Sequence, residues 1–259
     1  MFTEHSKIDQ FEEPRLYHCT KYEALKAILD SKQLLPSYCL ERASFMKEYP
    51  EGAYAMVCFA DLMRNEVGRH MASFHADSYI VMDKQWAREK LVAPVTYYID
   101  NSIPSITYRE WLKRLSKENK CRIWHKKRKH LLLKNATNMF VPFMKQYEGV
   151  YFDKKIGEFS TETRIFYLER EWRWCPLVEG REAYYLTKEM YLDKTRREDE
   201  LNRLRSRYAL GFGWNAILEI GVPKKHLSEI EDLCVNKFGI IPSQARNKII
   251  IQDFELHKA

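Results

Sequence analysis

The chain has few of the residues that build flexible linkers, and it lacks the common local signatures of nucleotide-binding loops. Nine Gly and nine Pro in 259 residues leave no room for a long flexible linker, so we expect one domain spanning residues 1–259. No G-x-G-x-x-G and no G-x-x-x-x-G-K-[ST] motif occurs. Neither a Rossmann crevice nor a P-loop is therefore predicted.

Cysteine pairs and long apolar runs are absent as well. The six Cys are scattered, with no C-x-x-C pair and no His spacing typical of zinc, so we expect reduced thiols and no metal site. The first seven residues lack the basic-then-apolar order of a signal peptide. No apolar stretch approaches the ~18 residues that cross a bilayer. These absences predict a cytoplasmic protein with no membrane partner.

Positive charge is abundant and unevenly distributed. The formal net charge is +7, and the window from Arg109 to Lys134 holds eleven Lys or Arg against two Glu. Such basic stripes favour phosphate backbones, so we expect a nucleic-acid partner, single-stranded RNA in particular. A solvated helix face is the alternative interpretation of the same charges. The candidate nucleic-acid contacts are Trp124, Lys126, Lys127, Arg128 and Lys129.

Hydrophobic periodicity predicts short strands separated by helices of uneven length, which indicates an α+β fold. Residues 33–55 are expected to be rich in loops. Basic helices are predicted over about 105–145, as an insertion, and a charged helix over about 189–208. The predicted strands are Leu16–Cys19, Ala55–Phe59, Tyr79–Met82, Glu171–Cys175, Asn215–Gly221 and Lys248–Gln252.

The stretch Leu16–Thr20 places two polar side chains at a strand tip. An apolar strand ends in His18-x-Thr20 and turns directly into an amphipathic helix. Thr20 and Glu23 have the Thr-x-x-Glu spacing of a capping box, so Thr20 has a purely structural interpretation as a helix cap. His18 likewise has an interpretation as a hydrogen-bonded histidine at the rim of the core.

A second polar stretch begins about 150 residues later. Residues 171–175 alternate polar with bulky side chains, which predicts a half-buried strand. Glu169 and Arg173 would lie on the same strand face as Glu171, because side chains in a strand repeat every two residues. Surface ion pairs with Arg170 and Arg173 are the alternative role for the two glutamates.

These stretches together resemble two related groups of proteins. Tyr17–Thr20, followed by Leu25, Ile28 and Leu29, is similar to the first strand and helix of ADP-ribosyltransferase-like proteins, including the DarT toxins. A longer ordered set resembles the AbiGi family of abortive-infection phage-resistance proteins. Its segments are Leu16–Thr20, Met56–Asp61, His70, Lys84–Trp86, Pro94–Tyr97 and Glu169–Arg173.

The resemblance implies an ADP-ribosyltransferase-like split β-sheet, with surrounding helices, that clamps NAD. Glu171 would be the catalytic carboxylate, binding the ribose next to the C1′ that becomes positive as nicotinamide leaves. His18 would act with it by holding the other ribose. The implied NAD contacts are His18, Thr20, Tyr17, Tyr79, His75 and Glu169, and no metal is implied.

The leading hypothesis is therefore an NAD-dependent ADP-ribosyltransferase toxin of a phage-defence system that modifies nucleic acid, RNA in particular. A cognate antitoxin, and a chaperone beside it, would be its protein partners. One alternative is a transferase that acts on protein, and another is a non-catalytic antitoxin or sensor module. Relatives carry a Tyr-Gly-x-Tyr-Gly-like segment where this chain has residues 75–79 without glycine, which favours the non-catalytic alternative. Retention of His18 and Glu171 favours the enzyme.

Overall fold

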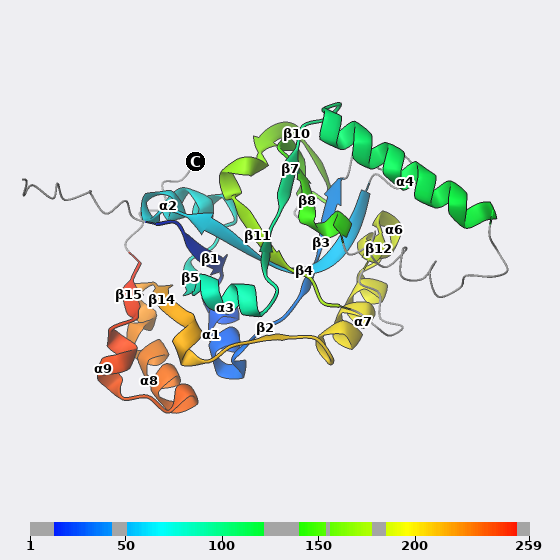
Figure 1. The fold of residues 1–259 in the computed structure, drawn as a ribbon. Helices are drawn as coiled ribbons and strands as arrows, with labels where there is room; N and C mark the ends of the chain where they lie inside the picture. Colours follow the sequence, from blue (N-terminus) through cyan, green and yellow to red (C-terminus); the bar gives the residue numbers. More distant parts are fainter. Residues whose placement is uncertain (1–12, 43–50, 122–139, 154–155, 178–184, 253–259) are drawn as a thin grey trace, which may run out of the picture.

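The structure is a computed structural model that describes residues 13–42, 51–121, 140–153, 156–177 and 185–252 (Figure 1). Its centre is a mixed sheet in the order β15-β14-β5-β1-β4-β11-β6, antiparallel except for the parallel pair β14 and β15. The predicted α+β class is confirmed, whereas the ADP-ribosyltransferase-like split sheet stays a prediction. The strands are β1 (Arg15–Thr20), β4 (Glu51–Leu62), β5 (Ser78–Met82), β6 (Ala93–Pro94), β11 (Glu171–Trp174), β14 (Ile217–Val222) and β15 (Ile249–Ile251).

Strand β4 joins two parts of the molecule. Its C-terminal half pairs with β1 and β11, and its N-terminal half pairs with β3 (Ser37–Arg42) and β12 (Tyr185–Thr187). Nearly every residue from Gly52 to Ala60 is buried, as expected for a strand covered on both faces. The loop prediction for residues 33–55 is therefore wrong where the chain forms β3 and the start of β4.

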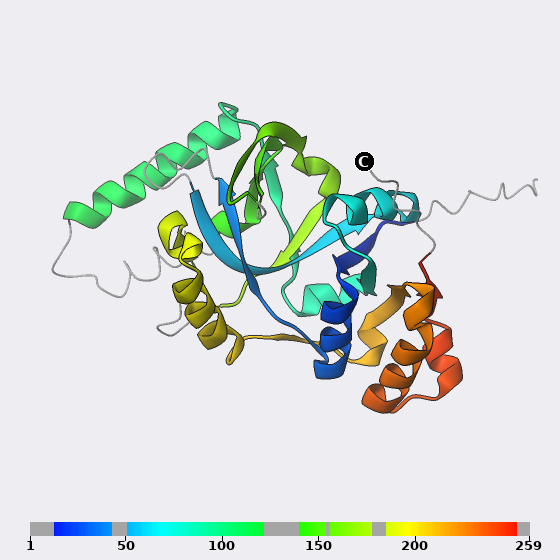
Figure 2. The same ribbon diagram turned by 180° about the vertical axis from the view of Figure 1, so that it is seen from behind.

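Helices cover the sheet and extend from its ends (Figures 1 and 2). The described helices are α1 (Tyr22–Ser31), α2 (Arg64–Ser73), α3 (Lys84–Glu89), α4 (Ile103–Cys121), α6 (Lys188–Leu192), α7 (Lys194–Arg205), α8 (Leu227–Phe238) and α9 (Pro242–Arg246). Short 3-10 turns are η1 (Val141–Phe143), η2 (Phe166–Glu169), η3 (Trp214–Ala216) and η4 (Lys224–His226). Three two-stranded pairs are formed by β2 (Gln33–Leu34) with β13 (Leu210–Gly211), β7 (Thr96–Tyr98) with β8 (Met144–Gln146), and β9 (Glu148–Asp153) with β10 (Glu158–Ile165).

The alternation of β1 separates two hydrophobic cores. Leu16 points into the cluster that α1 and α8 form with one face of the sheet, which includes Leu25 and Ile230. Tyr17 points to the opposite face, where Met71 of α2 helps to cover it. Because neighbouring strand residues point to opposite faces, a single short strand serves both cores. The sheet therefore packs against helices on both of its faces.

Two helix predictions need correction. Thr20 does not cap α1; instead, Asp77 accepts a hydrogen bond of 2.7 Å from the backbone N–H of Tyr22. The expected helix over 189–208 is interrupted at Asp193, whose carboxylate accepts from the N–H of Arg196 and so starts α7. In both places an aspartate satisfies free N–H groups at a helix start.

The basic insertion is described only in part. Its first portion forms α4, whereas the candidate nucleic-acid residues Trp124, Lys126, Lys127, Arg128 and Lys129 lie outside the described residues. Among the helices within the described ranges, none is long and apolar enough to cross a membrane.

Candidate functional site

A cavity of about 1010 Å³ opens between the two parts of the molecule that β4 joins. Strands β1, β3 and β4, helices α1 and α2, and the β8–β10 region contribute its walls. The structure brings most of the predicted site residues to this cavity: Tyr17, His18, Thr20, His75, Glu169 and Glu171. The two side chains on which the sequence argument depended, His18 and Glu171, thus line one cavity.

Tyr79 is the exception among the predicted residues. It is fully buried, its ring packs edge-on against Tyr17 at 5.3 Å, and its hydroxyl donates a hydrogen bond of 2.7 Å to Glu219. It does not line the cavity. The predicted contact of Tyr79 with NAD is therefore wrong, because its side chain points into the core beneath α2.

The hydrogen bonding of His18 defines what it presents to a ligand. Its Nδ1 lies 2.8 Å from the carbonyl oxygen of Cys58, which can only accept, so Nδ1 carries the proton. Burial lowers the pKa of His18, against the opposing effect of the bond to Cys58. The ring is therefore neutral at pH 7, and Nε2 is a hydrogen-bond acceptor, suited to a hydroxyl group.

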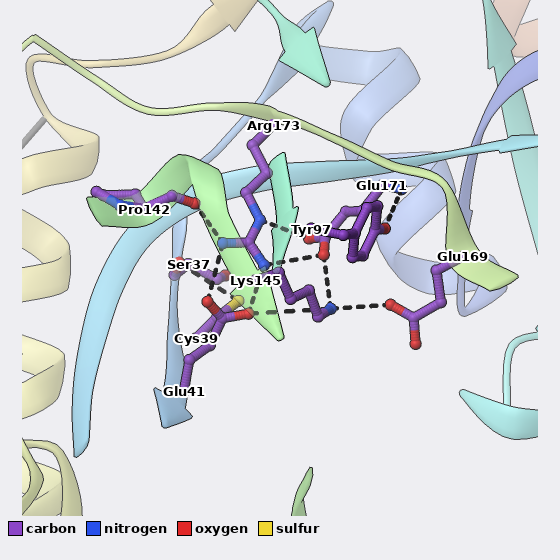
Figure 3. A network of polar contacts seen from close by, with 9 residues as sticks. All are labelled: Ser37, Cys39, Glu41, Tyr97, Pro142, Lys145, Glu169, Glu171 and Arg173. Carbon is purple, nitrogen blue, oxygen red and sulfur yellow. Dashed lines mark hydrogen bonds and ion pairs between the residues drawn. The ribbon is translucent and has the colours of Figure 1, made fainter. Parts of the chain in front are cut away.

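Glu171 opens β11 and is held by two cations (Figure 3). Arg173 donates from Nε to Oε1 and from Nη2 to Oε2 of Glu171, both at 2.9 Å, which is a bidentate pair. Lys145 Nζ donates to Oε2 at 2.6 Å. Glu171 and Arg173 are both buried, at 6% and 0% exposure. Glu171 is thus an anchored carboxylate.

Two further carboxylates complete this network, which we call the charge cluster: Glu41, Lys145, Glu169, Glu171 and Arg173 (Figure 3). Glu41 of β3 accepts from Arg173 Nη1 at 2.8 Å and also from Nη2. Lys145 donates to Glu169 at 2.9 Å. Three carboxylates and two cations leave one excess negative charge beside the cavity.

Mutual attraction keeps Glu171, Lys145 and Arg173 ionised despite their burial. Burial alone would raise the pKa of Glu171, but the charges of Arg173 and Lys145 outweigh it and hold that pKa well below its usual value. Burial likewise opposes the charge of Lys145, and the three carboxylates outweigh it and raise its pKa. A general acid or base works best with a pKa near 7, so Glu171 is poorly suited to proton transfer.

Glu169 joins the charge cluster from a 3-10 turn, whereas the sequence predicts an extended strand at this position. It lies in η2, followed by Arg170 in the left-handed region at φ 39°, and not in an extended strand. Arg170 turns away to pair with Glu66 and to donate to the Asp61 carbonyl at 2.6 Å. Of the ion pairs expected at the surface, the one between Glu171 and Arg173 forms, but both of its side chains are buried.

Sequence reasoning missed Glu41 and Lys145. Glu41 follows an alternating stretch in which Tyr38 and Leu40 are buried, so period-2 patterning was an available signal for this strand. Lys145 falls in the region expected to be a basic helix, and no local pattern distinguishes it from the neighbouring cations. Its role becomes visible only in the folded chain.

Two histidines of α2 and its C-terminal end also line the cavity. His70 has a pKa lowered to about 4, chiefly by burial, with Glu171 opposing the shift and Lys145 and Arg164 adding to it. His75 has a positive φ of 52°. In the described part of the chain, no three His, Cys, Asp or Glu side chains are grouped to hold a metal ion.

The fold and site define an α+β protein whose open cavity is flanked by a buried charge cluster. A family model described as "Putative abortive phage resistance protein AbiGi, antitoxin" matches residues 32–223, about three quarters of the sequence. The chain therefore belongs to the AbiGi family. No curated protein and no solved structure matches it.

The family description corrects the leading functional hypothesis. AbiGi proteins are described as antitoxins, so the predicted ADP-ribosyltransferase toxin acting on RNA is wrong, and the non-catalytic alternative fits better. The abortive-infection setting is confirmed. The prediction failed because His18 and Glu171 indicate a cavity, whereas they do not specify what the cavity does.

Proposed function

We propose that this chain is the antitoxin of an abortive-infection toxin–antitoxin pair and that it neutralises its cognate toxin by binding it. The observation that carries this proposal is the family match, which spans the region from β2 to β14 and so includes the charge cluster. In this role the protein partner is a toxin, in place of the antitoxin expected from the sequence.

The state of Glu171 supports a non-catalytic role. Both of its oxygens accept from Arg173, and one also accepts from Lys145. A carboxylate that must accept a substrate hydroxyl would have to share or exchange these charge-assisted bonds, which are about twice as strong as neutral ones. The cluster therefore fits a structural anchor that joins β3, β8 and β11.

Co-expression with the product of the neighbouring gene tests the proposal. We expect that product to arrest growth alone, and this chain to restore growth and to co-purify with it. A control with an early stop codon in this chain keeps the transcript but removes the protein, so it should not restore growth. Growth arrest by this chain expressed alone would contradict the proposal.

We also propose that the cavity binds NAD as a ligand, without a transfer step. The volume of about 1010 Å³ is at the upper end for small-molecule sites. His18 Nε2 would accept a ribose hydroxyl. Arg164 lines the cavity and stacks on Tyr151, with its guanidinium 4.2 Å from the ring centroid, so it would hold the pyrophosphate.

Calorimetric titration with NAD tests this second proposal. We expect His18→Ala and Arg164→Met each to weaken binding about tenfold, the loss of one charge-assisted or buried hydrogen bond. His226→Ala is the matched control, because His226 stacks on Tyr22 and does not line the cavity. Equal affinity of the wild type and all three variants, or no binding by the wild type, would contradict the proposal.

A further inference from the structure

Helix α4 projects from the body of the molecule (Figures 1 and 2). Its start is anchored: Ser105 is buried and donates to the Ser102 carbonyl at 3.0 Å, and Tyr108 packs against the cluster that contains Tyr98 and Val141. The 19 residues span about 28 Å at 1.5 Å per residue. A helix of this length is sufficient to present a binding face to a partner.

One face of α4 carries large apolar side chains in solvent. Ile103 is 81% exposed, Ile106 is 40% exposed and Trp111 is 42% exposed. At 100° per residue these three lie within an arc of about 140°, on the side opposite Ser105. Trp111 contacts Tyr108 at 5.4 Å between ring centroids, and Tyr108 contacts the half-exposed Phe140 at the same distance. Grouped apolar side chains on a surface commonly mark a protein interface.

Basic residues accompany this apolar face. Arg114 and Lys113 are exposed on the same side, where Lys113 pairs with the exposed Glu110, and α4 as a whole has five Lys or Arg against two Glu. A second copy of this chain, with the same basic helix and a net charge of +7, would repel it. A phosphate backbone would match the cations but would leave the isoleucines uncovered. An acidic protein surface with an apolar groove satisfies both features.

We propose that the docking face of α4, consisting of Ile103, Ile106, Trp111, Lys113 and Arg114, binds an acidic, apolar-grooved surface of the cognate toxin. Trp111 and Ile103 enter the groove, and Lys113 and Arg114 face carboxylates at its rim. This inference rests on the proposed antitoxin function and names the surface and the chemistry of the partner.

The test measures the affinity of the purified full-length chain for the toxin that passes the co-expression experiment. We expect Trp111→Ala and Ile103→Ser each to weaken binding tenfold or more, because buried aromatic anchors dominate such interfaces. Arg114→Glu should weaken binding and slow association, most strongly at low salt. All three side chains are exposed, so the thermal midpoints should stay close to that of the wild type.

Matched controls come from the opposite end of the molecule. Ile241→Ser removes an isoleucine that is 60% exposed ahead of α9, and Lys225→Glu reverses an exposed charge in η4. Both should bind within twofold of the wild type. Equal binding by α4 variants and controls would overturn the docking face and leave the antitoxin function standing. Failure of the wild type itself to bind would overturn both.

A parallel titration with a random-sequence single-stranded RNA distinguishes the other class of partner. We expect the α4 variants to lose toxin binding regardless of any RNA affinity. Loss of RNA binding by Arg114→Glu, with toxin binding unchanged in all three variants, would overturn the proposal in favour of a nucleic-acid surface.

Discussion

Arg173 donates two hydrogen bonds of 2.9 Å to the carboxylate of Glu171, which lies two residues earlier on the same strand. Both side chains point to one face of β11, as the strand period requires. The pair connects β11 to β3 through Glu41 and to β8 through Lys145. The carboxylate that the sequence singles out for chemistry is thus a buried link among three strands.

Removing the central cation should destabilise the protein strongly. Arg173→Met leaves the Glu171 and Glu41 carboxylates without their guanidinium, so we expect the free energy of unfolding to fall by about 3–5 kcal/mol. Urea denaturation measures the loss. Arg203→Met is the matched control, because Arg203 pairs with Glu200 on the surface at 66% exposure, and it should cost under about 1 kcal/mol. Equal losses in the two variants would contradict a structural charge cluster.

The start of α1 depends on Asp77 and not on Thr20. Asp77→Ala removes the acceptor for the Tyr22 N–H, so we expect a loss of about 1–2 kcal/mol in the free energy of unfolding. Thr20→Ala should cost less than about 0.5 kcal/mol. Thermal denaturation of both variants decides between the capping box expected from the sequence and the observed cap. A larger loss of unfolding free energy for Thr20→Ala than for Asp77→Ala would support the Thr20 capping box instead.

Close packing makes Gly221 difficult to replace. A Cβ at this position would overlap the ring of Tyr79, which is buried and hydrogen-bonded to Glu219. We therefore expect Gly221→Ala to cost about 1–3 kcal/mol through overpacking. Gly213→Ala is the control, since no heavy atom lies within 4 Å of its Cβ position. Chemical denaturation of both variants should separate them clearly, and a neutral Gly221→Ala would contradict this packing.

Stability should fall as the pH drops below 6.5. The pKa of His70 is lowered from 6.5 to about 4, mainly by burial, so the unfolded chain binds this proton before the folded chain does. His18 acts in the same direction. Between pH 6.5 and about 4, the wild type should lose stability more steeply than His70→Asn, by up to ~1 kcal/mol per pH unit. Parallel pH profiles of the two proteins would exclude a contribution from His70.

Local sequence patterns predict the strands whose apolar runs are not interrupted by proline or glycine. The apolar run Tyr79–Met82 predicts the strand that the structure shows as β5, Ser78–Met82. The loop prediction for residues 33–55 failed because Pro36, Pro50 and Gly52 are residues typical of loops, although β3 lies between the two prolines. Pairing with the long β4 outweighs those signals.

Some polar residues of the cavity were predictable from local spacing, whereas others come together only in the folded chain. Period-2 spacing placed Arg173 in phase with Glu171, and the strand tip placed His18 and Thr20 together, because backbone geometry acts over a few residues. Glu41 lies 132 residues from Arg173, and no short-range pattern brings them together. Electrostatic attraction depends on distance in space, so the ionisation of Glu171 and its bonds to Arg173 and Lys145 were decided only when the strands assembled.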